Sequence, residues 1–245
     1  FFSPCTMFPG LQTQLPWGDS EVPAGELLLV THAATEVDGR FLLHHFLTQG
    51  LKVGGHAVLC AFHHTLMHYS SVQKKLDVPL ETMSERLHFI DCVTGADEGF
   101  LYEPATAPLA ALSQRIVRQL EAAGPSDAAL VLVDDLTTVC SLAPLQEVLA
   151  FVWGLHALAK ERGVCVLILM GNDVPEEAHL VNMLRHISVA HFDVTALASG
   201  YSRDVTGLAS VAIRNPVTLQ RDVKQLQYKV LDSTVRFGLR GSIPQ

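Results

Sequence analysis

The residues between an apolar strand and an apolar helix near the start of the chain lie where a phosphate-binding loop would lie. A working loop has Gly, four residues, Gly, Lys and then Ser or Thr, because close backbone N–H groups, an ammonium and a hydroxyl must surround the phosphates and Mg²⁺. The residues at these positions are Ala34, Gly39, Arg40 and Phe41.

These four residues match the phosphate-loop pattern in part and lack most of the groups that bind phosphate and Mg²⁺. Gly39 is retained and Arg40 carries a positive charge. Ala34, however, adds a Cβ where the backbone should approach phosphate, and Phe41 offers the metal no oxygen. We interpret the segment as a nucleotide-binding architecture whose nucleotide chemistry has been removed, and we predict no cofactor.

A carboxylate at the end of a later strand supports the same architecture. Residues 130–133 are all apolar and lead into Asp134 and Asp135. P-loop ATPases hold Mg²⁺ through such an Asp, although any buried parallel strand can end in Asp, so the pattern alone favours a structural role. Combined with the position of Gly39 and the order of the strands, it indicates a RecA-like fold.

An active enzyme of this class also needs a carboxylate that orients the attacking water, usually at the end of the second strand. Here that strand ends in Phe62, His63 and His64. The Lys, the hydroxyl and the Glu are thus all missing, and each charge-assisted contact contributes about 1.5–3 kcal/mol. We therefore predict no catalytic residue, nucleotide affinity lowered by orders of magnitude, and a role for Asp134 in anchoring a neighbouring loop.

Histidines raise a zinc site as an alternative. His64 and His68 are spaced four apart on a predicted helix, as zinc ligands often are. A metalloprotease would need Glu directly after the first His, but Thr65 stands there, and no downstream spacing completes a ligand set. We predict no bound metal and interpret the pair as a helix face near an interface. A zinc hydrolase stays as an alternative that a metal assay would remove.

The basic residues concentrate late in the chain. On a protein of formal net charge −8, such a cluster can make one face fit to contact RNA phosphates or a partner. The alternative, preferred for any single residue, is a solvated strand edge, because charged side chains commonly block such edges. The candidate RNA or partner contacts are Arg203, Arg214, Arg221 and Lys224.

Alternating strands and helices must position these residues. Predicted strands lie at 26–31, 57–62, 87–92, 128–133 and 164–170, and predicted helices at 39–49, 65–76, 109–120, 145–162 and 175–187. Continuously apolar strands between helices imply an α/β fold with a mostly parallel sheet covered on both faces. The later strands at 192–197, 208–214, 225–231 and 235–239 are joined by turns, which predicts an antiparallel extension at the sheet edge.

Composition sets the domain organisation. With 245 residues, of which 49% are hydrophobic, the chain can bury a large core, and we predict one RecA-like domain over residues 26–245. Residues 1–25 are rich in Pro, Gly and polar side chains and are predicted to form an N-terminal arm, with residues 1–6 as an upstream extension or a vector remnant.

Charge and cysteine use restrict the class of protein further. The acidic net charge argues against a protein that holds nucleic acid by its global field. The five cysteines, odd in number and far apart, suit reduced, buried thiols of an intracellular protein. We predict the cytoplasm as its compartment, with the nucleus as a second one. The apolar stretch 142–159 contains polar residues and is interpreted as a buried helix, so we predict no membrane association.

Several stretches in a fixed order carry a family pattern. They are residues 41–47 (Phe-Leu-Leu-His-His-Phe-Leu), 68–76 (His-Tyr-Ser-Ser-Val-Gln-Lys-Lys-Leu), 132–136 (Leu-Val-Asp-Asp-Leu), 197–205 (Leu-Ala-Ser-Gly-Tyr-Ser-Arg-Asp-Val) and 228–230 (Tyr-Lys-Val). As a set they resemble the subunit 6 family of the Elongator complex, over nearly the whole chain. Residues 95–127 and 172–183 show no family pattern, and the histidines of residues 63–68 look peculiar to this chain.

The resemblance implies a RecA-like subunit without a working phosphate loop. It further implies a hetero-hexameric ring of two copies each of this chain and Elongator subunits 4 and 5, which binds tRNA and joins the remaining Elongator subunits in modifying wobble uridines. The modification chemistry would belong to another subunit. The alternative is an active ATPase in which Arg40 replaces Lys and neighbouring subunits complete the site, although the planar guanidinium suits a tight loop poorly.

Overall fold

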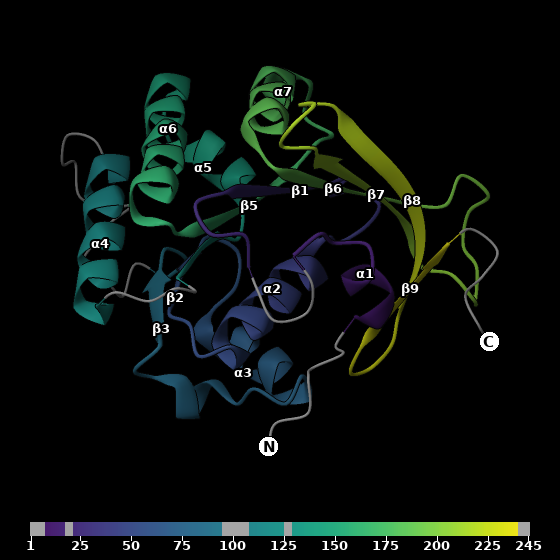
Figure 1. Ribbon diagram of the computed structural model, residues 1–245, viewed down its shortest axis with the longest axis horizontal. Coiled ribbons are helices and arrows are strands. Elements are labelled where there is room, and N and C mark those ends of the chain that lie inside the picture. Colours follow the sequence, from purple (N-terminus) through teal and green to yellow (C-terminus); the bar gives the residue numbers. More distant parts are fainter. Residues whose placement is uncertain (1–7, 18–21, 95–107, 125–128, 240–245) are drawn as a thin grey trace.

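The computed structural model describes residues 8–17, 22–94, 108–124 and 129–239. In these ranges one sheet of nine strands runs through the protein in the order β3-β2-β4-β5-β1-β6-β7-β8-β9 (Figure 1). The strands are β1 (Leu27–His32), β2 (Ala57–Ala61), β3 (Leu87–Asp91), β4 (Leu130–Val133), β5 (Cys165–Gly171), β6 (Ala190–Thr195), β7 (Gly207–Arg214), β8 (Arg221–Val230) and β9 (Val235–Leu239).

The parallel part of the sheet consists of β1 to β6. β1 lies in its middle and pairs in parallel with β5 on one side and β6 on the other. All residues of β1, β2, β4 and β5 are buried, because helices cover both faces, so these strands need no polar alternation. The predicted α/β fold with a mostly parallel sheet is confirmed.

Helices divide into two layers around the sheet (Figure 1). One layer holds α1 (Pro9–Gln12), α2 (Arg40–Lys52) and α3 (Leu66–Lys75), and the other holds α4 (Pro108–Ala123), α5 (Leu136–Leu142), α6 (Leu145–Arg162) and α7 (Ala178–Ile187). Short 3-10 turns, η1 (Leu80–Met83) and η2 (Pro175–Glu177), follow α3 and precede α7. Each layer encloses its own apolar core against one face of the sheet.

The antiparallel extension starts one strand later than the sequence predicted. β6 pairs in parallel with β1, through Leu28 to His32, and only its other edge is antiparallel, to β7. β8 also begins at Arg221 rather than Gln225. The first half of β8 is largely exposed, so it lacks the run of apolar residues that predicts a strand. Backbone pairing with β7 extends β8 to Arg221.

Two elements escaped the sequence reading. Residues 8–15, predicted as part of the N-terminal arm without a helix of their own, contain α1 and bury Phe8, Leu11 and Leu15 in the same core as α2. α1 lies so close to β9 that a Cβ on Gly10 would meet the Phe237 carbonyl oxygen at 2.1 Å. The second missed element is α5, which follows Asp135 directly. The boundary placed between residues 25 and 26 stays a prediction.

Other expectations concern cysteines, caps and membranes. Cys60, Cys92 and Cys165 are buried as predicted, whereas Cys5, the extension at 1–6 and the segment 95–107 lie outside the described residues. Gly163 ends α6 in the left-handed conformation, with φ of 67°. Among the residues described, no helix combines the length and apolarity that crossing a membrane requires.

Candidate functional site

The loop between β1 and α2 uses its own N–H groups within the protein. The Thr35 N–H donates to Asp173 Oδ2 at 3.1 Å, and so does the Thr35 hydroxyl, also at 3.1 Å. The N–H groups of Glu36 and Val37 both donate to the Ala33 carbonyl. In a working loop such donors surround phosphate. Here a carboxylate and a carbonyl accept from them instead.

Asp173 takes a place that an anionic ligand would need. It is the second residue after β5, which ends at Gly171, and lies at the end of the parallel strands where the loop lies. Desolvation alone would raise its pKa, but hydrogen bonds from Thr35 and from the backbone of Asp173 and Ala34 together lower it, so the carboxylate is ionised at neutral pH. A negative charge against the loop repels phosphate. The sequence places Asp173 shortly after an apolar strand, but its contact with Thr35 depends on β5 lying beside β1.

Gly39 is held by His32. The His32 Nδ1 atom lies 3.1 Å from the Gly39 nitrogen and 3.0 Å from the Val37 oxygen, so the ring bonds the loop in either tautomer. Burial lowers the pKa of His32, which keeps the ring neutral. A Cβ on Gly39 would lie 3.3 Å from both Val30 Cγ1 and His32 Cβ. Close packing therefore explains the retained glycine without any ligand.

Arg40 directs its charge at acidic side chains. Its Nη1 lies 3.2 Å from Asp38 Oδ1 and its Nη2 lies 3.6 Å from Asp135 Oδ2. The backbone N–H of Arg40 also donates to Asp38, at 2.9 Å. Asp135 in turn caps α5 by accepting from the N–H groups of Thr137 and Thr138. The one cation of the loop is thus paired inside the protein.

Phe41 belongs to an aromatic cluster. Its ring centroid lies 4.9 Å from that of Tyr228, 6.1 Å from Phe237 and 6.2 Å from Phe8. These partners come from β8, β9 and the segment before α1. An active loop has at this position a hydroxyl that binds Mg²⁺. This protein has an aromatic ring there, packed between the segment before α1 and the last two strands, β8 and β9.

Asp134 anchors the turn between β2 and α3, as the sequence analysis predicted. Its oxygens accept from the Phe62 N–H at 2.6 Å, the His63 N–H at 3.3 Å and the Tyr69 hydroxyl at 2.7 Å. The side chain is fully buried. Desolvation, the largest influence, raises the pKa of Asp134 despite these donors. The carboxylate that would face Mg²⁺ in an ATPase is enclosed and bonded on both oxygens.

The end of β2 carries histidines where a catalytic glutamate is expected. His63 Nδ1 lies 3.6 Å from Asp135 Oδ2. The rings of His64 and His68 stack with centroids 3.8 Å apart, and the His44 ring lies 5.9 Å from His68. Across the described ranges, no three His, Cys, Asp or Glu side chains gather closely enough to hold a metal ion.

The four basic candidates divide into two pairs. Arg214 donates to the His186 and Ile187 carbonyls, and Arg221 donates to those of Arg185 and Ser188, so both bond the end of α7. Arg203 and Lys224 are exposed. Contact of any of the four with RNA or a partner stays a prediction.

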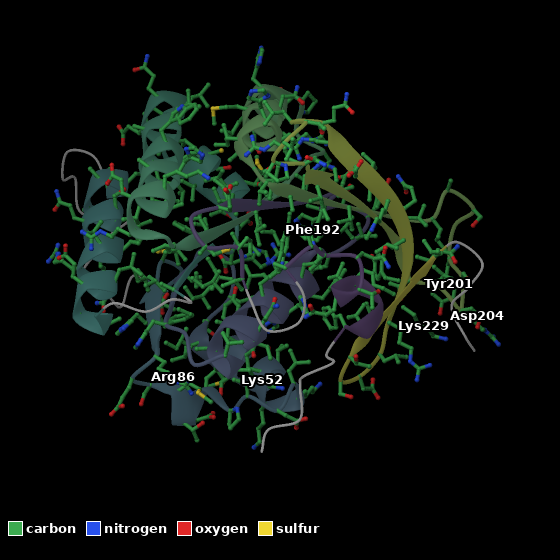
Figure 2. The ribbon with its side chains drawn as sticks, viewed as in Figure 1. Lys52, Arg86, Phe192, Tyr201, Asp204 and Lys229 are labelled. Carbon is green, nitrogen blue, oxygen red and sulfur yellow. The ribbon has the colours of Figure 1, made fainter. Side chains whose placement is uncertain are left out.

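Arg203 lies in the exposed loop that connects β6 and β7, at one end of these strands. In the same loop Tyr201 is 94% exposed, and Asp204 lies 3.9 Å from Lys229 of β8 (Figure 2). This loop presents one aromatic ring and both signs of charge to solvent.

Known proteins resemble this chain over nearly all of it. The model of the family described as "Elongation complex protein 6" matches residues 8–232. Elongator complex protein 6 of Homo sapiens is 31% identical over 265 residues, which cover 97% of this chain and 99% of the human protein. The protein of the same name from Mus musculus is 30% identical over equal shares of both chains.

A solved structure supports the fold independently. The KaiC-like protein of Pyrococcus horikoshii superimposes with a TM-score of 0.68 over 95% of this chain and 97% of that one, at 12% sequence identity. This likeness shows a RecA-like fold and nothing finer. Since the family model and the relatives span almost the full sequence, the chain belongs to the Elongator complex protein 6 family.

Proposed function

We propose that this chain is a non-catalytic RecA-like subunit of Elongator. In this proposal it assembles with Elongator subunits 4 and 5 into a hetero-hexameric ring, two copies of each, that binds tRNA and supports modification of its wobble uridine. The ring joins the remaining Elongator subunits, and the chain works in the cytoplasm and also in the nucleus.

One observation carries the non-catalytic part of the proposal: the phosphate loop is closed by its own protein. Asp173 and Asp38 accept from loop N–H groups, His32 bonds the loop backbone at Gly39 or Val37, and Arg40 is paired with two aspartates. A nucleotide would have to displace an ionised carboxylate and compete with existing ion pairs, and it would gain no Lys, hydroxyl or catalytic Glu in return. Family membership supports the assembly part.

The assembly is tested by mass. The chain is co-produced with Elongator subunits 4 and 5, and the mass of the purified complex is compared with that of the chain alone. A discrete six-subunit complex that binds tRNA, while the chain alone does not, is the expected result. A stable monomer that binds neither subunit 4 nor subunit 5 would contradict the proposed ring.

Nucleotide titration tests the alternative of an active ATPase completed by neighbouring subunits. We expect no saturable ATP binding by the chain alone, and no ATP hydrolysis in the ring that depends on Arg40. Because Asp134 anchors a buried turn, Arg40→Gln is a cleaner variant than any change at Asp134. Hydrolysis that Arg40→Gln abolishes, with the ring mass unchanged, would establish the active ATPase and overturn the non-catalytic proposal.

A further inference from the structure

Three arginines gather at the end of α7, where the chain turns into β6. Arg185 belongs to α7, Arg214 ends β7 and Arg221 begins β8. Arg214 and Arg221 are direct partners in the antiparallel ladder, and both donate to main-chain carbonyls of residues 185–188. Each of the three arginines is partly buried. Segments distant in sequence thus bring three cationic groups to one helix end.

His191 of β6 shows that the charges of Arg185 and Arg221 meet beside one imidazole ring. Burial, and next the charge of Arg185, lower the pKa of His191 to about 4, and Arg221 acts in the same direction. The charge of Asp193 opposes them, but the Asp193 carboxylate already accepts from the Thr31 hydroxyl at 2.6 Å. The arginines therefore form a cluster in space and not only along the sheet.

The protein does not neutralise this cluster with carboxylates. Within the described ranges none of Arg185, Arg214 and Arg221 forms an ion pair, although the chain has 25 acidic residues against 17 Lys and Arg. Like charges directly opposite each other on neighbouring strands are destabilising. The carbonyls at a helix C-terminus carry only about half an elementary charge, against three guanidinium groups. Positive charge is therefore left over at the end of α7.

Two nitrogens of the cluster are hydrogen-bond donors without an acceptor. Arg185 Nε and Arg221 Nη1 are buried, and neither donates a hydrogen bond. The whole Arg185 side chain forms no hydrogen bond to any residue that the structure describes. A buried donor without a partner is costly, and more so when the group is charged. Arg221 is explained in part by the helix end that it bonds, whereas the Arg185 side chain has no such role in the fold.

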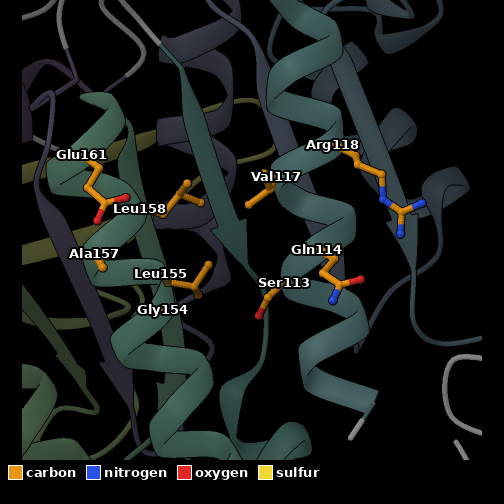
Figure 3. Close-up of a pocket in the computed structure, with 9 residues that line it drawn as sticks. All are labelled: Ser113, Gln114, Val117, Arg118, Gly154, Leu155, Ala157, Leu158 and Glu161. Atoms are coloured by element: carbon orange, nitrogen blue, oxygen red, sulfur yellow. The ribbon is translucent and has the colours of Figure 1, made fainter.

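The hollow between α4 and α6 differs from this cluster in its charge (Figure 3). It has a volume of about 500 Å³, and its lining contains one cation, Arg118, and one anion, Glu161. The charges in that lining are balanced, so they select no class of ligand. At the end of α7 the charge has one sign and the unpartnered groups are all donors. The ligand that complements them is an anion.

We propose that Arg185, Arg214 and Arg221 bind a phosphate ion against the end of α7. Arg185 Nε and Arg221 Nη1 donate to its oxygens, and Arg214 adds charge. Guanidinium groups suit phosphate because their planar fork donates parallel hydrogen bonds. A dianion also neutralises more of the three charges than one carboxylate does. The two donors are buried, which favours a free ion over an RNA strand, because an RNA backbone is contacted along a row of exposed cations.

The arginine cluster and the phosphate loop lie at opposite ends of β1. The Val189 N–H, directly after Ser188 at the end of α7, donates to the Leu27 carbonyl at the start of β1, whereas the loop follows the end of β1. The inference therefore depends neither on the proposed ring nor on the loss of nucleotide chemistry. Saturating phosphate in the ATP titrations keeps ATP from occupying the arginine cluster, so the two proposals fail separately.

Calorimetric titration of the full chain with sodium phosphate, at an ionic strength held constant with NaCl, tests the site. We expect saturable binding of one phosphate per chain. Arg185→Gln removes a charge and the Nε donor, and should weaken binding by about ten-fold or more, because a charge-assisted hydrogen bond is lost. Arg236→Gln, the same change at an exposed position of β9, should bind as wild type does. Equal affinity of wild type and Arg185→Gln, or no saturable binding by wild type, would overturn the proposal.

Melting curves show whether Arg185→Gln is folded and provide a second readout. In NaCl alone the variant should melt at or above the wild-type temperature, because it relieves repulsion among like charges. Phosphate should raise the melting temperature of wild type and of Arg236→Gln and leave that of Arg185→Gln nearly unchanged. Equal stabilisation of all three proteins by phosphate would overturn the proposal. So would a lower melting temperature of Arg185→Gln in NaCl, which would give Arg185 a structural role.

Competition distinguishes a free phosphate ion from a phosphate group of RNA. The titration with phosphate is repeated in the presence of tRNA, again with the full chain. We expect the affinity for phosphate to stay the same, because the two donors are buried. Displacement of phosphate by tRNA would overturn the proposal, since the three arginines would then belong to an RNA-binding surface.

Discussion

Arg214 and Arg221 face each other across β7 and β8, and both guanidinium groups donate to main-chain carbonyls at the end of α7. Helix carbonyls at a C-terminus lack intrahelical partners and carry partial negative charge. Two arginines that sequence reasoning offered as RNA contacts therefore fasten a helix to the sheet. Burial, and then the nearby Arg214, lowers the pKa of Arg221, although a guanidinium stays charged at neutral pH.

Removing Arg221 is expected to destabilise the fold. Arg221→Ala removes the charged donor of the Ser188 carbonyl and leaves the Arg185 carbonyl with the Ser188 hydroxyl alone, and hydrogen bonds to a charged group contribute about 1.5–3 kcal/mol. We expect the free energy of unfolding in urea to fall by about 2 kcal/mol. Lys224→Ala, at an exposed position of the same strand, serves as control and should change stability by under about 0.5 kcal/mol. Equal effects of the two variants would refute the fastening role.

The same pair of variants separates stability from RNA binding. If Lys224 contacts tRNA, Lys224→Ala lowers the affinity of the assembled ring for tRNA and flattens its dependence on salt, because one phosphate contact is lost. Filter binding at several salt concentrations measures both quantities. If the affinity for tRNA and its dependence on salt are both unchanged, Lys224 is a solvated strand residue and not an RNA contact.

Tyr69→Phe tests the anchoring by Asp134. The substitution removes the hydroxyl that lies 2.7 Å from Asp134 Oδ2 and leaves a buried carboxylate with one donor fewer. We expect a loss of about 1–3 kcal/mol in the free energy of unfolding. Hydrogen exchange of the Phe62 and His63 amides should quicken, since both donate to the same carboxylate. Stability equal to wild type, with unchanged exchange, would argue against the anchor.

Two buried histidines of α2 make stability depend on pH. Burial lowers the pKa of both His44 and His45 to about 3 from an ordinary value near 6.5. Between these values the unfolded chain binds protons that the folded chain excludes, so stability is full above pH 6.5 and falls as the pH falls toward 3. We expect a loss of about 2 kcal/mol for each histidine between pH 7 and pH 5.

Urea unfolding at pH 7, 6 and 5 measures this dependence. His45→Gln should reduce the slope by the contribution of one histidine and not abolish it, because the pKa values of His44, His64 and His191 are lowered as well. His179→Gln, an exposed change on α7, should leave the slope intact. A slope that neither variant alters would place the acid sensitivity elsewhere in the molecule.

Restoring the phosphate-loop sequence should not restore nucleotide binding. In an Ala34→Gly, Arg40→Lys, Phe41→Ser variant, Asp173 still accepts from Thr35 and His32 still holds Gly39. We expect no saturable signal with a fluorescent ATP analogue. Adding Asp173→Ala, which frees the Thr35 N–H and removes the opposing charge, should give measurable binding. Binding by the three-residue variant would show that Ala34, Arg40 and Phe41, and not Asp173, had prevented nucleotide binding.

Much of this fold could be predicted because buried parallel strands consist of unbroken runs of apolar residues, as in residues 130–133 and 164–170. The role of Asp134 followed from the same reasoning, since its strand and the missing partners were both visible. The exposed start of β8 was not predictable, because its pairing depends on β7 and not on its own side chains. Asp173 reaches the loop only because β5 lies beside β1. A local sequence pattern does not show which strands are neighbours, so this contact could not be predicted.

The aromatic contacts of Phe41 also bear on how the protein reaches its folded state. Phe237 of β9 packs against both Phe41 and Phe8, and loops closed by contacts so distant in sequence form slowly. We therefore expect the aromatic cluster of Phe8, Phe41 and Tyr228 to stay incomplete during synthesis until Phe237 of β9 has been added. Shortening the protein before Phe237 should yield an aggregating chain rather than a smaller stable domain.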